Sequence, residues 1–259
     1  MKTQQLTMLL AALLILASCK KQSAEPQMLA TQDAALMATN LQQPPIPLPD
    51  SINPADFVTG INNPYFPQKP GTVFHYINTY IDSGKLIHEY IDVITTYDTK
   101  VILGVTCEVV HDVVKIKGKL SEDTYDWYAQ DKKGNVWYFG EDTKKYDSNG
   151  GYSTAGSFEA GVNGAGAGIA MYGDILAHIG IKYYQEYSVG VAEDAGKILN
   201  VNSTAKVAYN TFNNCVQTAE TTRLTPGEVE HKFYARNLGQ VLTVTNQGER
   251  EELISISHF

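Results

Sequence analysis

The sequence lacks the short motifs that mark the common catalytic folds. It has no G-x-S-x-G nucleophile elbow, no H-E-x-x-H pair, and no glycine-rich segment followed by Lys-Ser or Lys-Thr that would cradle a phosphate. It also lacks an internal repeat of the length that builds solenoids or propellers. We therefore predict no catalytic residues, no metal and no cofactor from local sequence, and these absences favour a binding protein over an enzyme.

Positive charge is also scarce. The chain has 20 Lys and Arg against 28 Asp and Glu, which gives a formal net charge of −8 at pH 7. Proteins that bind nucleic acids or anionic membrane surfaces do so through basic patches. This charge balance argues against nucleic acid as a partner, and it indicates no oligomeric state.

Long hydrophobic runs are absent after the N-terminus. The one apolar run, residues 6–17, follows the basic Lys2 and is too short to span a bilayer comfortably. Leu16-Ala17-Ser18-Cys19 resembles the lipobox of bacterial lipoproteins. The resemblance implies cleavage before Cys19 and its modification with diacylglycerol and a further fatty acid such as palmitate, which would tie the protein to a membrane. An ordinary secretory signal that contains a cysteine is the alternative.

The residue after the cysteine bears on which membrane holds the protein. Lys20 stands where a signal for retention in the inner membrane would usually have Asp, so we expect an exported protein anchored in the outer membrane. The periplasmic and the surface side of that membrane both stay open.

Only three cysteines are present. With Cys19 modified by lipid, Cys107 and Cys215 remain, and two thiols in an oxidising compartment tend to pair. We predict a disulfide between them. Two buried free thiols are the alternative.

The composition divides the chain into three parts. Residues 1–18 form the signal peptide, and residues 19–55 form a tether rich in Ala, Gln, Pro and Ser that cannot bury much apolar surface. Residues 56–259 are expected to form a single β-rich domain.

Strand-forming residues dominate this domain. Predicted strands are 72–81, 86–96, 101–116, 120–131, 136–147, 229–235, 239–245 and 250–257. One convincing helical pattern covers residues 191–199, and a second candidate covers residues 170–180. The Gly/Ala-rich segment 156–173 is interpreted as a long ordered loop. The fold class is therefore mainly β, an antiparallel meander curled into a half-barrel or barrel, with one or two short helices and a long Gly-rich loop.

One stretch gathers aromatic and acidic residues, "DTYDWYAQDKKGNVWYFGED" at 123–142. Alternation places Asp126 and Tyr128 on one face of its first strand and Tyr125 and Trp127 on the other. Residues 131–135 have the composition of a tight turn. We interpret the stretch mainly as a well-made hairpin, with one apolar face and one face that is solvated or lines a cavity.

Five segments together indicate a family. "NNPYFPQKPGT", "ILGVTCEVVHD", "DTYDWYAQDKKGNVWYFGEDT", "FEAGVNGA" and "EHKFYARNLGQVL" resemble an uncharacterised family of bacterial secreted proteins and lipoproteins. More distantly, the exported strand meander is similar to the half-barrel carriers of lipophilic molecules typified by LolA and LppX. The first resemblance implies no activity, and the second implies a fold rather than a function.

Three functions are compatible with these features. The first is a non-catalytic binding or carrier module for an apolar or amphiphilic ligand, and the alternatives are a carboxylate-dependent hydrolase and a structural or assembly accessory of the cell envelope. For the hydrolase, paired acidic residues such as Glu122, Asp126, Glu141, Glu186 and Glu230 are available. A metal site has no local signature and would have to assemble across strands, for example from His75, His88 and His231. The predicted ligand-binding residues are Trp127, Trp137, Tyr138, Phe139, Glu230 and Phe233.

Overall fold

The computed structural model describes Ile46 and residues 51–259. The signal peptide, the lipobox cysteine Cys19 and most of the tether lie outside the described residues. The described part is almost entirely antiparallel sheet, as the alternation of the sequence predicts. No helix in residues 51–259 is long and apolar enough to cross a bilayer.

The strands follow one another closely along the chain. They are β1 (Phe57–Val58), β2 (Thr72–Asp82), β3 (Lys85–Ile102), β4 (Val105–Ile116), β5 (Lys119–Asp131), β6 (Val136–Tyr146), β7 (Tyr152–Ser153), β8 (Phe158–Glu159), β9 (Gly166–Met171), β10 (Lys182–Tyr184), β11 (Glu186–Tyr187), β12 (Asp194–Lys206), β13 (Thr211–Thr222), β14 (Glu230–Ala235), β15 (Gly239–Thr245) and β16 (Arg250–His258). Two short 3-10 turns, η1 (Pro54–Asp56) and η2 (Leu176–His178), are its only helical elements among the described residues.

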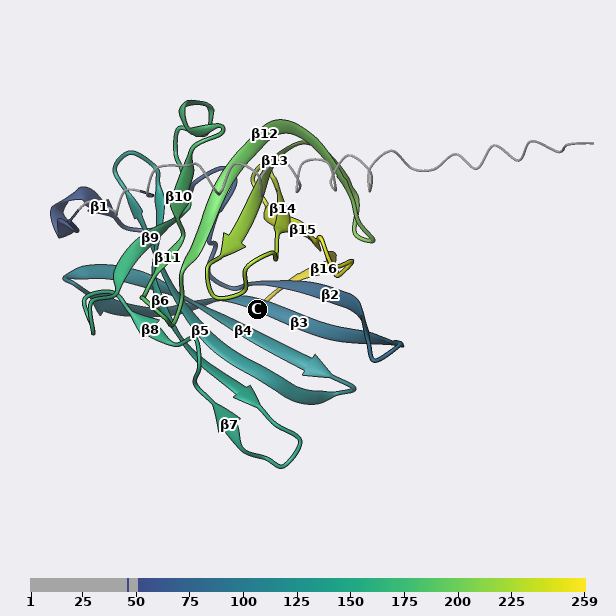
Figure 1. Ribbon diagram of the computed structural model, residues 1–259. Helices are drawn as coiled ribbons and strands as arrows, with labels where there is room; N and C mark the ends of the chain where they lie inside the picture. Colours follow the sequence, from purple (N-terminus) through teal and green to yellow (C-terminus); the bar gives the residue numbers. More distant parts are fainter. Residues whose placement is uncertain (1–45, 47–50) are drawn as a thin grey trace, which may run out of the picture.

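The sheet curls into a barrel with one seam. Its strand order is β10-β12-β13-β14-β15-β16-β2-β3-β4-β5-β6-β9-β11, so the C-terminal β16 pairs with β2 and joins the two halves. Figure 1 shows β2–β6 on one side and β12–β16 on the other. At the seam, the edge formed by β9 and β11 lies against the edge formed by β10 and β12, where the backbone N–H of Gln185 donates to the backbone carbonyl of Asp194.

The helix predicted over residues 191–199 is wrong, because this segment opens β12. Ala195 and Ile198 are buried there, and the strand pairs with β10 on one side and β13 on the other. Gly196 permits the pairing, since a Cβ at this position would lie 2.8 Å from the ring of Tyr183 on β10. Tertiary pairing therefore overrides the local helix propensity.

Parts of the Gly/Ala-rich segment predicted as a loop are strands. Residues Phe158–Glu159 and Gly166–Met171 form β8 and β9, which extend the sheet beyond β6. The small residues are required by close approach: a Cβ on Gly168 would lie 2.1 Å from the backbone oxygen of Gln185. The segment therefore closes the barrel instead of covering it.

Several clusters of apolar residues stabilise the sheet. One cluster, which includes Tyr138, Ile169 and Ile198, packs where the seam closes. A separate cluster lies on the outer face of β4–β6, where Trp127 and Phe139 are buried. The aromatic hairpin of 123–142 thus presents one face to the outer core and the other to the inside of the barrel.

Candidate functional site

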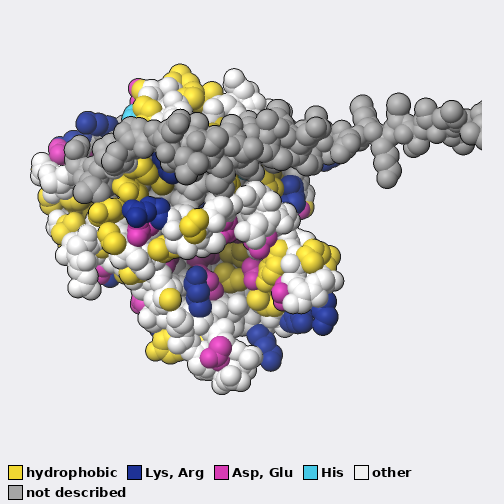
Figure 2. All heavy atoms as spheres, viewed as in Figure 1, with side chains coloured by type: hydrophobic (Ala, Val, Ile, Leu, Met, Phe, Trp, Pro, Cys, Tyr) yellow, Lys and Arg dark blue, Asp and Glu magenta, His cyan; other side chains and the backbone are white. Residues whose placement is uncertain are grey.

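A cavity of about 420 Å³ lies inside the barrel. Its lining comes from both halves of the sheet and from a proline-rich segment, residues 62–71, called the proline loop below. The space-filling view shows the molecule hollowed between the two halves, with hydrophobic side chains inside the hollow and Asp and Glu side chains around it (Figure 2). The inside of the barrel is therefore partly open space rather than a fully packed core.

The lining is rich in carboxylates. Nine of its residues are acidic: Asp112, Asp126, Glu141, Glu186, Asp194, Glu220, Glu230, Glu249 and Glu251. One basic residue, Lys232, faces them. Buried charges in proteins are normally paired, so an excess of this size is unusual for a structural interior.

A β-bulge arranges the acidic groups of the aromatic hairpin. Strict alternation would place Tyr138 and Glu141 on opposite faces of β6, but the register shifts at Gly140, which has φ +125° and lies opposite Trp127. A Cβ on Gly140 would lie 2.1 Å from the backbone oxygen of Phe158, so only glycine fits. The bulge brings both Tyr138 and Glu141 to the cavity, with Glu141 directly opposite Asp126.

Tyr138 links the two carboxylates. Its hydroxyl lies 2.6 Å from Oδ1 of Asp126 and 3.1 Å from Oε2 of Glu141. Burial raises the pKa of Asp126 to about 7. Burial, together with the charge of Asp126, raises the pKa of Glu141 to about 7 as well. Both carboxyl groups of the pair therefore titrate near neutral pH.

Asp112 on β4 is the third carboxylate of this wall. It occupies the cavity face of the strand two residues after Val110, which pairs with Asp126. Its Oδ1 is buried and has no hydrogen-bond partner in the described part of the chain. Burial, and then the negative charge of Asp126, raises the pKa of Asp112 well above its ordinary value.

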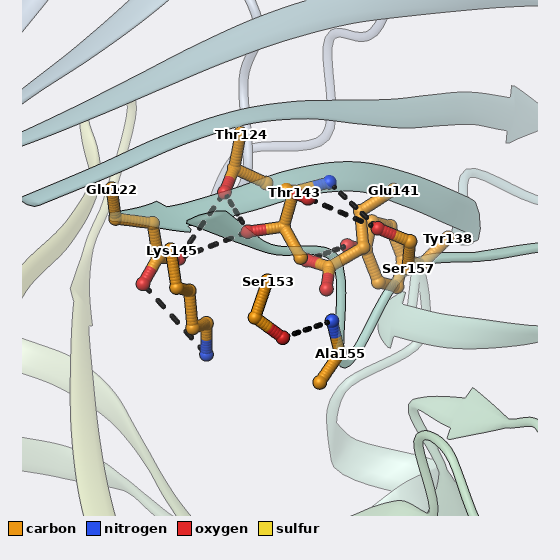
Figure 3. A network of polar contacts seen from close by, with 9 residues as sticks. All are labelled: Glu122, Thr124, Tyr138, Glu141, Thr143, Lys145, Ser153, Ala155 and Ser157. Carbon is orange, nitrogen blue, oxygen red and sulfur yellow. Dashed lines mark hydrogen bonds and ion pairs between the residues drawn. The ribbon is translucent and has the colours of Figure 1, made fainter. Parts of the chain in front are cut away.

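The rim of the same wall is built differently. Figure 3 shows Glu122 with Thr124, Thr143 and Lys145 on β5 and β6. Glu122 accepts a hydrogen bond from Thr124 at 3.1 Å and forms an ion pair with Lys145 at 3.7 Å. A carboxylate at the rim thus has a cation of its own, whereas Asp112 and Asp126 deeper in the barrel have none.

The opposite wall holds the lysine. Lys232 Nζ lies 2.6 Å from Glu220 and 3.5 Å from Glu230. Burial alone would raise the pKa of Glu220, but the ion pair with Lys232 outweighs it and the pKa is lowered. Glu251 accepts from the Gln240 amide at 2.8 Å, and burial raises its pKa to about 7. Lys232 is thus already paired on its own side of the cavity.

The proline loop closes one end of the cavity. The side-chain oxygen of Gln130 on β5 accepts hydrogen bonds from the backbone N–H groups of Asn62 and Asn63 at 2.9 and 2.8 Å. The side-chain NH2 of Gln130 donates to the side-chain oxygen of Asn62. This anchor places Phe66 in the lining, where its ring lies 5.1 Å from that of Tyr128. The Tyr128 ring in turn stacks on Tyr138 at 4.8 Å. Aromatic faces therefore adjoin the carboxylates.

The predicted ligand-binding residues are separated by the fold. Tyr138 and Glu230 line the cavity. Trp127 and Phe139 are buried in the outer cluster, and Trp137 packs against it. Phe233 of β14 is buried in a different cluster, which includes Leu242 of β15. The structure therefore brings two of the six to the cavity, and their role in binding stays a prediction.

Sequence reasoning missed several lining residues. Asp112, Glu220, Lys232 and Glu251 lie on four different strands, β4, β13, β14 and β16, so nothing in the local sequence groups them. The alternation of side chains along each strand could have identified them, because Asp112 lies on the same face of its strand as Val110, and Lys232 lies on the same face as Glu230. A charged residue on the face of a strand that should be buried indicates a cavity or a paired site.

The predicted disulfide is not formed. Cys107 and Cys215 are free thiols that are buried in different hydrophobic clusters. Cys107 lies in the outer cluster of β4–β6, and Cys215 lies in the cluster that contains Phe233. Burial raises the pKa of Cys107 to about 12, which makes it unreactive.

The histidines do not assemble into a site. His75 lies 2.6 Å from Asp92 and 2.8 Å from Ser257, and His231 is almost fully buried on the face of β14 opposite to the cavity. Within residues 51–259, no group of three His, Cys, Asp or Glu side chains is placed to hold a metal ion.

Comparison with known proteins gives a limited result. No protein-family model matches the chain, and no curated protein matches it. The fold is similar to that of a protein described as exported, with a YmcC-like fold, from Bacteroides fragilis, at 13% identity and a TM-score of 0.42 over 74% of this chain and 98% of that chain. A protein described as a lipoprotein from Parabacteroides distasonis matches at 12% identity and a TM-score of 0.40, again over 74% of this chain and 98% of that chain. Similarity at this level transfers no function.

Proposed function

We propose that this chain is a non-catalytic binding module of the bacterial cell envelope that holds an amphiphilic small molecule inside its barrel. The cavity carries the proposal. Its volume falls in the range of small-molecule sites, about 300–1,000 Å³. The lipobox sequence at Cys19 supports the envelope as its location, with the fatty acids as its link to the membrane.

The two kinds of lining favour an amphiphile. Phe74 on β2, Ile91 and Val93 on β3, and Val110 on β4 form an apolar wall. The carboxylates lie beside and opposite this wall. A wholly apolar ligand would strip water from those carboxylates without replacing their hydrogen bonds, which is costly. A molecule with one apolar and one polar part matches both surfaces.

The test is saturable binding of a fluorescent dye. The full-length chain in lipid nanodiscs is titrated with 1-aminoanthracene, whose emission rises in apolar pockets, and empty nanodiscs provide the blank. Val93→Trp places a large ring in the cavity and is expected to abolish saturable binding. Ile94→Trp, the next residue on β3, faces the other side of the sheet and is the matched control. Binding that survives Val93→Trp unchanged, or that is absent from the original chain, contradicts the proposal.

A hydrolase is the second candidate, and one observation favours it. Asp126 and Glu141 lie opposite each other, share the Tyr138 hydroxyl and have pKa values of about 7, so that one can be protonated while the other is ionised near neutral pH. Turnover of a chromogenic glycoside that is lost in both Asp126→Asn and Glu141→Gln would establish it. A broad substrate panel without turnover would leave binding as the function.

A further inference from the structure

We propose that the polar part of the ligand is an organic cation with N–H donors, such as a primary ammonium, and that Asp112, Asp126 and Glu141 receive it. These three residues are called the carboxylate triad below. The inference rests on the proposed function, because it names the class of ligand for the same cavity.

The triad forms a continuous acidic surface inside the barrel. Its members come from three neighbouring strands, β4, β5 and β6, and all three line the cavity. Glu141 is directly opposite Asp126, and Asp112 is diagonal to it across the β4–β5 pair. A single ammonium group placed between adjacent strands can therefore reach more than one carboxylate.

The triad lacks a cation of its own. Lys232 is the one basic residue in the lining, and it is held by Glu220 at 2.6 Å and Glu230 at 3.5 Å. No ion pair joins Asp112, Asp126 or Glu141 to a lysine, arginine or histidine within residues 51–259. An ionised carboxylate in such a place needs an opposite charge, and a bound cation would supply it.

Asp112 points to a ligand that donates hydrogen bonds. Its Oδ1 is buried and accepts nothing in the described part of the chain, although buried acceptors are normally satisfied. An ammonium N–H would satisfy it, whereas a quaternary ammonium has no hydrogen to donate. Primary and secondary amines are thus favoured over trimethylammonium compounds.

A metal ion does not fit the same place. The described residues contain no group of three side chains positioned to ligate a metal. The triad instead adjoins ring faces: Tyr138 stacks on Tyr128, which contacts Phe66 of the proline loop. Cations bind favourably to the faces of aromatic rings, and the apolar wall of β2–β4 accommodates a carbon chain. Carboxylates, rings and apolar wall together describe a site for an alkyl or aryl amine.

The test compares three probes that share a six-carbon chain and differ in charge. Hexylamine, 1-hexanol and hexanoate are titrated calorimetrically into the full-length chain in lipid nanodiscs at about pH 8, where the amine is cationic. The amine is expected to bind about ten- to a hundredfold more tightly than the alcohol, because charge-assisted hydrogen bonds contribute about 1.5–3 kcal/mol each. Hexanoate is expected to show no saturable binding.

Two variants assign the effect to the triad. Glu141→Gln is expected to reduce the preference for the amine over the alcohol, while Asp142→Asn, on the exposed neighbour, leaves it unchanged. Equal affinity for hexylamine and 1-hexanol in the unmodified chain overturns the cation inference and leaves the proposed function standing. Failure of all three probes to bind, with no binding of 1-aminoanthracene, overturns both. An amine preference that Glu141→Gln and Asp112→Asn both leave intact overturns the assignment to the triad.

Discussion

At the scale of single residues, Asp112 shows how far this interior departs from a structural core. Its carboxylate is buried among other acids, and one oxygen has no partner in the described residues. Natural proteins keep such groups where function requires them, because they cost stability in the empty protein. Asp112 should therefore be a residue whose replacement helps folding and harms binding.

Asp112→Asn is expected to raise the free energy of unfolding at about pH 7.5 by on the order of 1–3 kcal/mol. The reason is the raised pKa: the unfolded chain gains more from ionisation of this group than the folded protein does. The gain should largely vanish near about pH 3, where the carboxyl group is mostly protonated in both states. Urea unfolding at the two pH values measures it, with Asp142→Asn as the exposed control. A loss of stability at pH 7.5 would contradict the account.

At the scale of elements, the bulge in β6 decides which side chains enter the cavity. Gly140 is expected to be irreplaceable, because an added Cβ would meet the Phe158 backbone at 2.1 Å and the residue has a positive φ. Gly140→Ala should destabilise the protein by about 3 kcal/mol or more and weaken ligand binding by displacing Glu141.

Gly118→Ala is the matched control for that change. Gly118 has φ +75° but no atom within 4 Å of an added Cβ, so the substitution should cost only about 1–2 kcal/mol of backbone strain. Similar losses of stability in the two variants would show that the close approach to Phe158 is unimportant.

The proline loop is the second element that matters for the site. Gln130→Ala removes the acceptor of the Asn62 and Asn63 N–H groups and is expected to cost about 2–4 kcal/mol. Hydrogen exchange should become faster in residues 62–68 and stay unchanged in β13. Lys132→Ala, on an exposed residue of the same hairpin, serves as the control. Unchanged exchange in the loop would show that Gln130 does not hold it.

Sequence patterns predicted the meander but not all of its strands. The alternation from residue 72 to 146 and from 229 to 258 identified β2–β6 and β14–β16, and it placed Asp126 and Tyr128 on one face. It could not place Glu141, because a bulge reverses the alternation and depends on a distant backbone contact. It also missed β9 and the whole of β12, where glycines such as Gly168 and Gly196 are chosen for close approach rather than for strand propensity.

At the scale of the whole molecule, the acidic interior should govern the dependence of stability on pH. Asp126, Glu141 and Glu251 have pKa values of about 7 in the folded protein, against ordinary values of 3.8 for Asp and 4.5 for Glu. The folded state therefore binds more protons than the unfolded state between these values. Stability should decrease as pH rises from about 4.5 to about 7 and level off above about 7.

Glu220 acts in the opposite direction at lower pH. Its pKa is lowered by Lys232, so the stability that it contributes is lost as pH falls below the ordinary value of 4.5. A maximum of Tm below about pH 4.5 follows, and circular dichroism melts from about pH 3 to 8 would locate it. The decline above the maximum should be shallower in Glu141→Gln. A Tm that rises steadily from about pH 5 to 7 would contradict the assignment of buried, unpaired acids.

The most direct test of the central claim is the mass of the protein with whatever its cavity carries. The full-length chain is purified from bacterial membranes and analysed by native mass spectrometry, alongside Val93→Trp and Ile94→Trp. The account predicts a bound amphiphilic amine, released on denaturation, in the original chain and in Ile94→Trp, and its absence from Val93→Trp. A chain that emerges bare, or a molecule that remains bound to Val93→Trp, would contradict it.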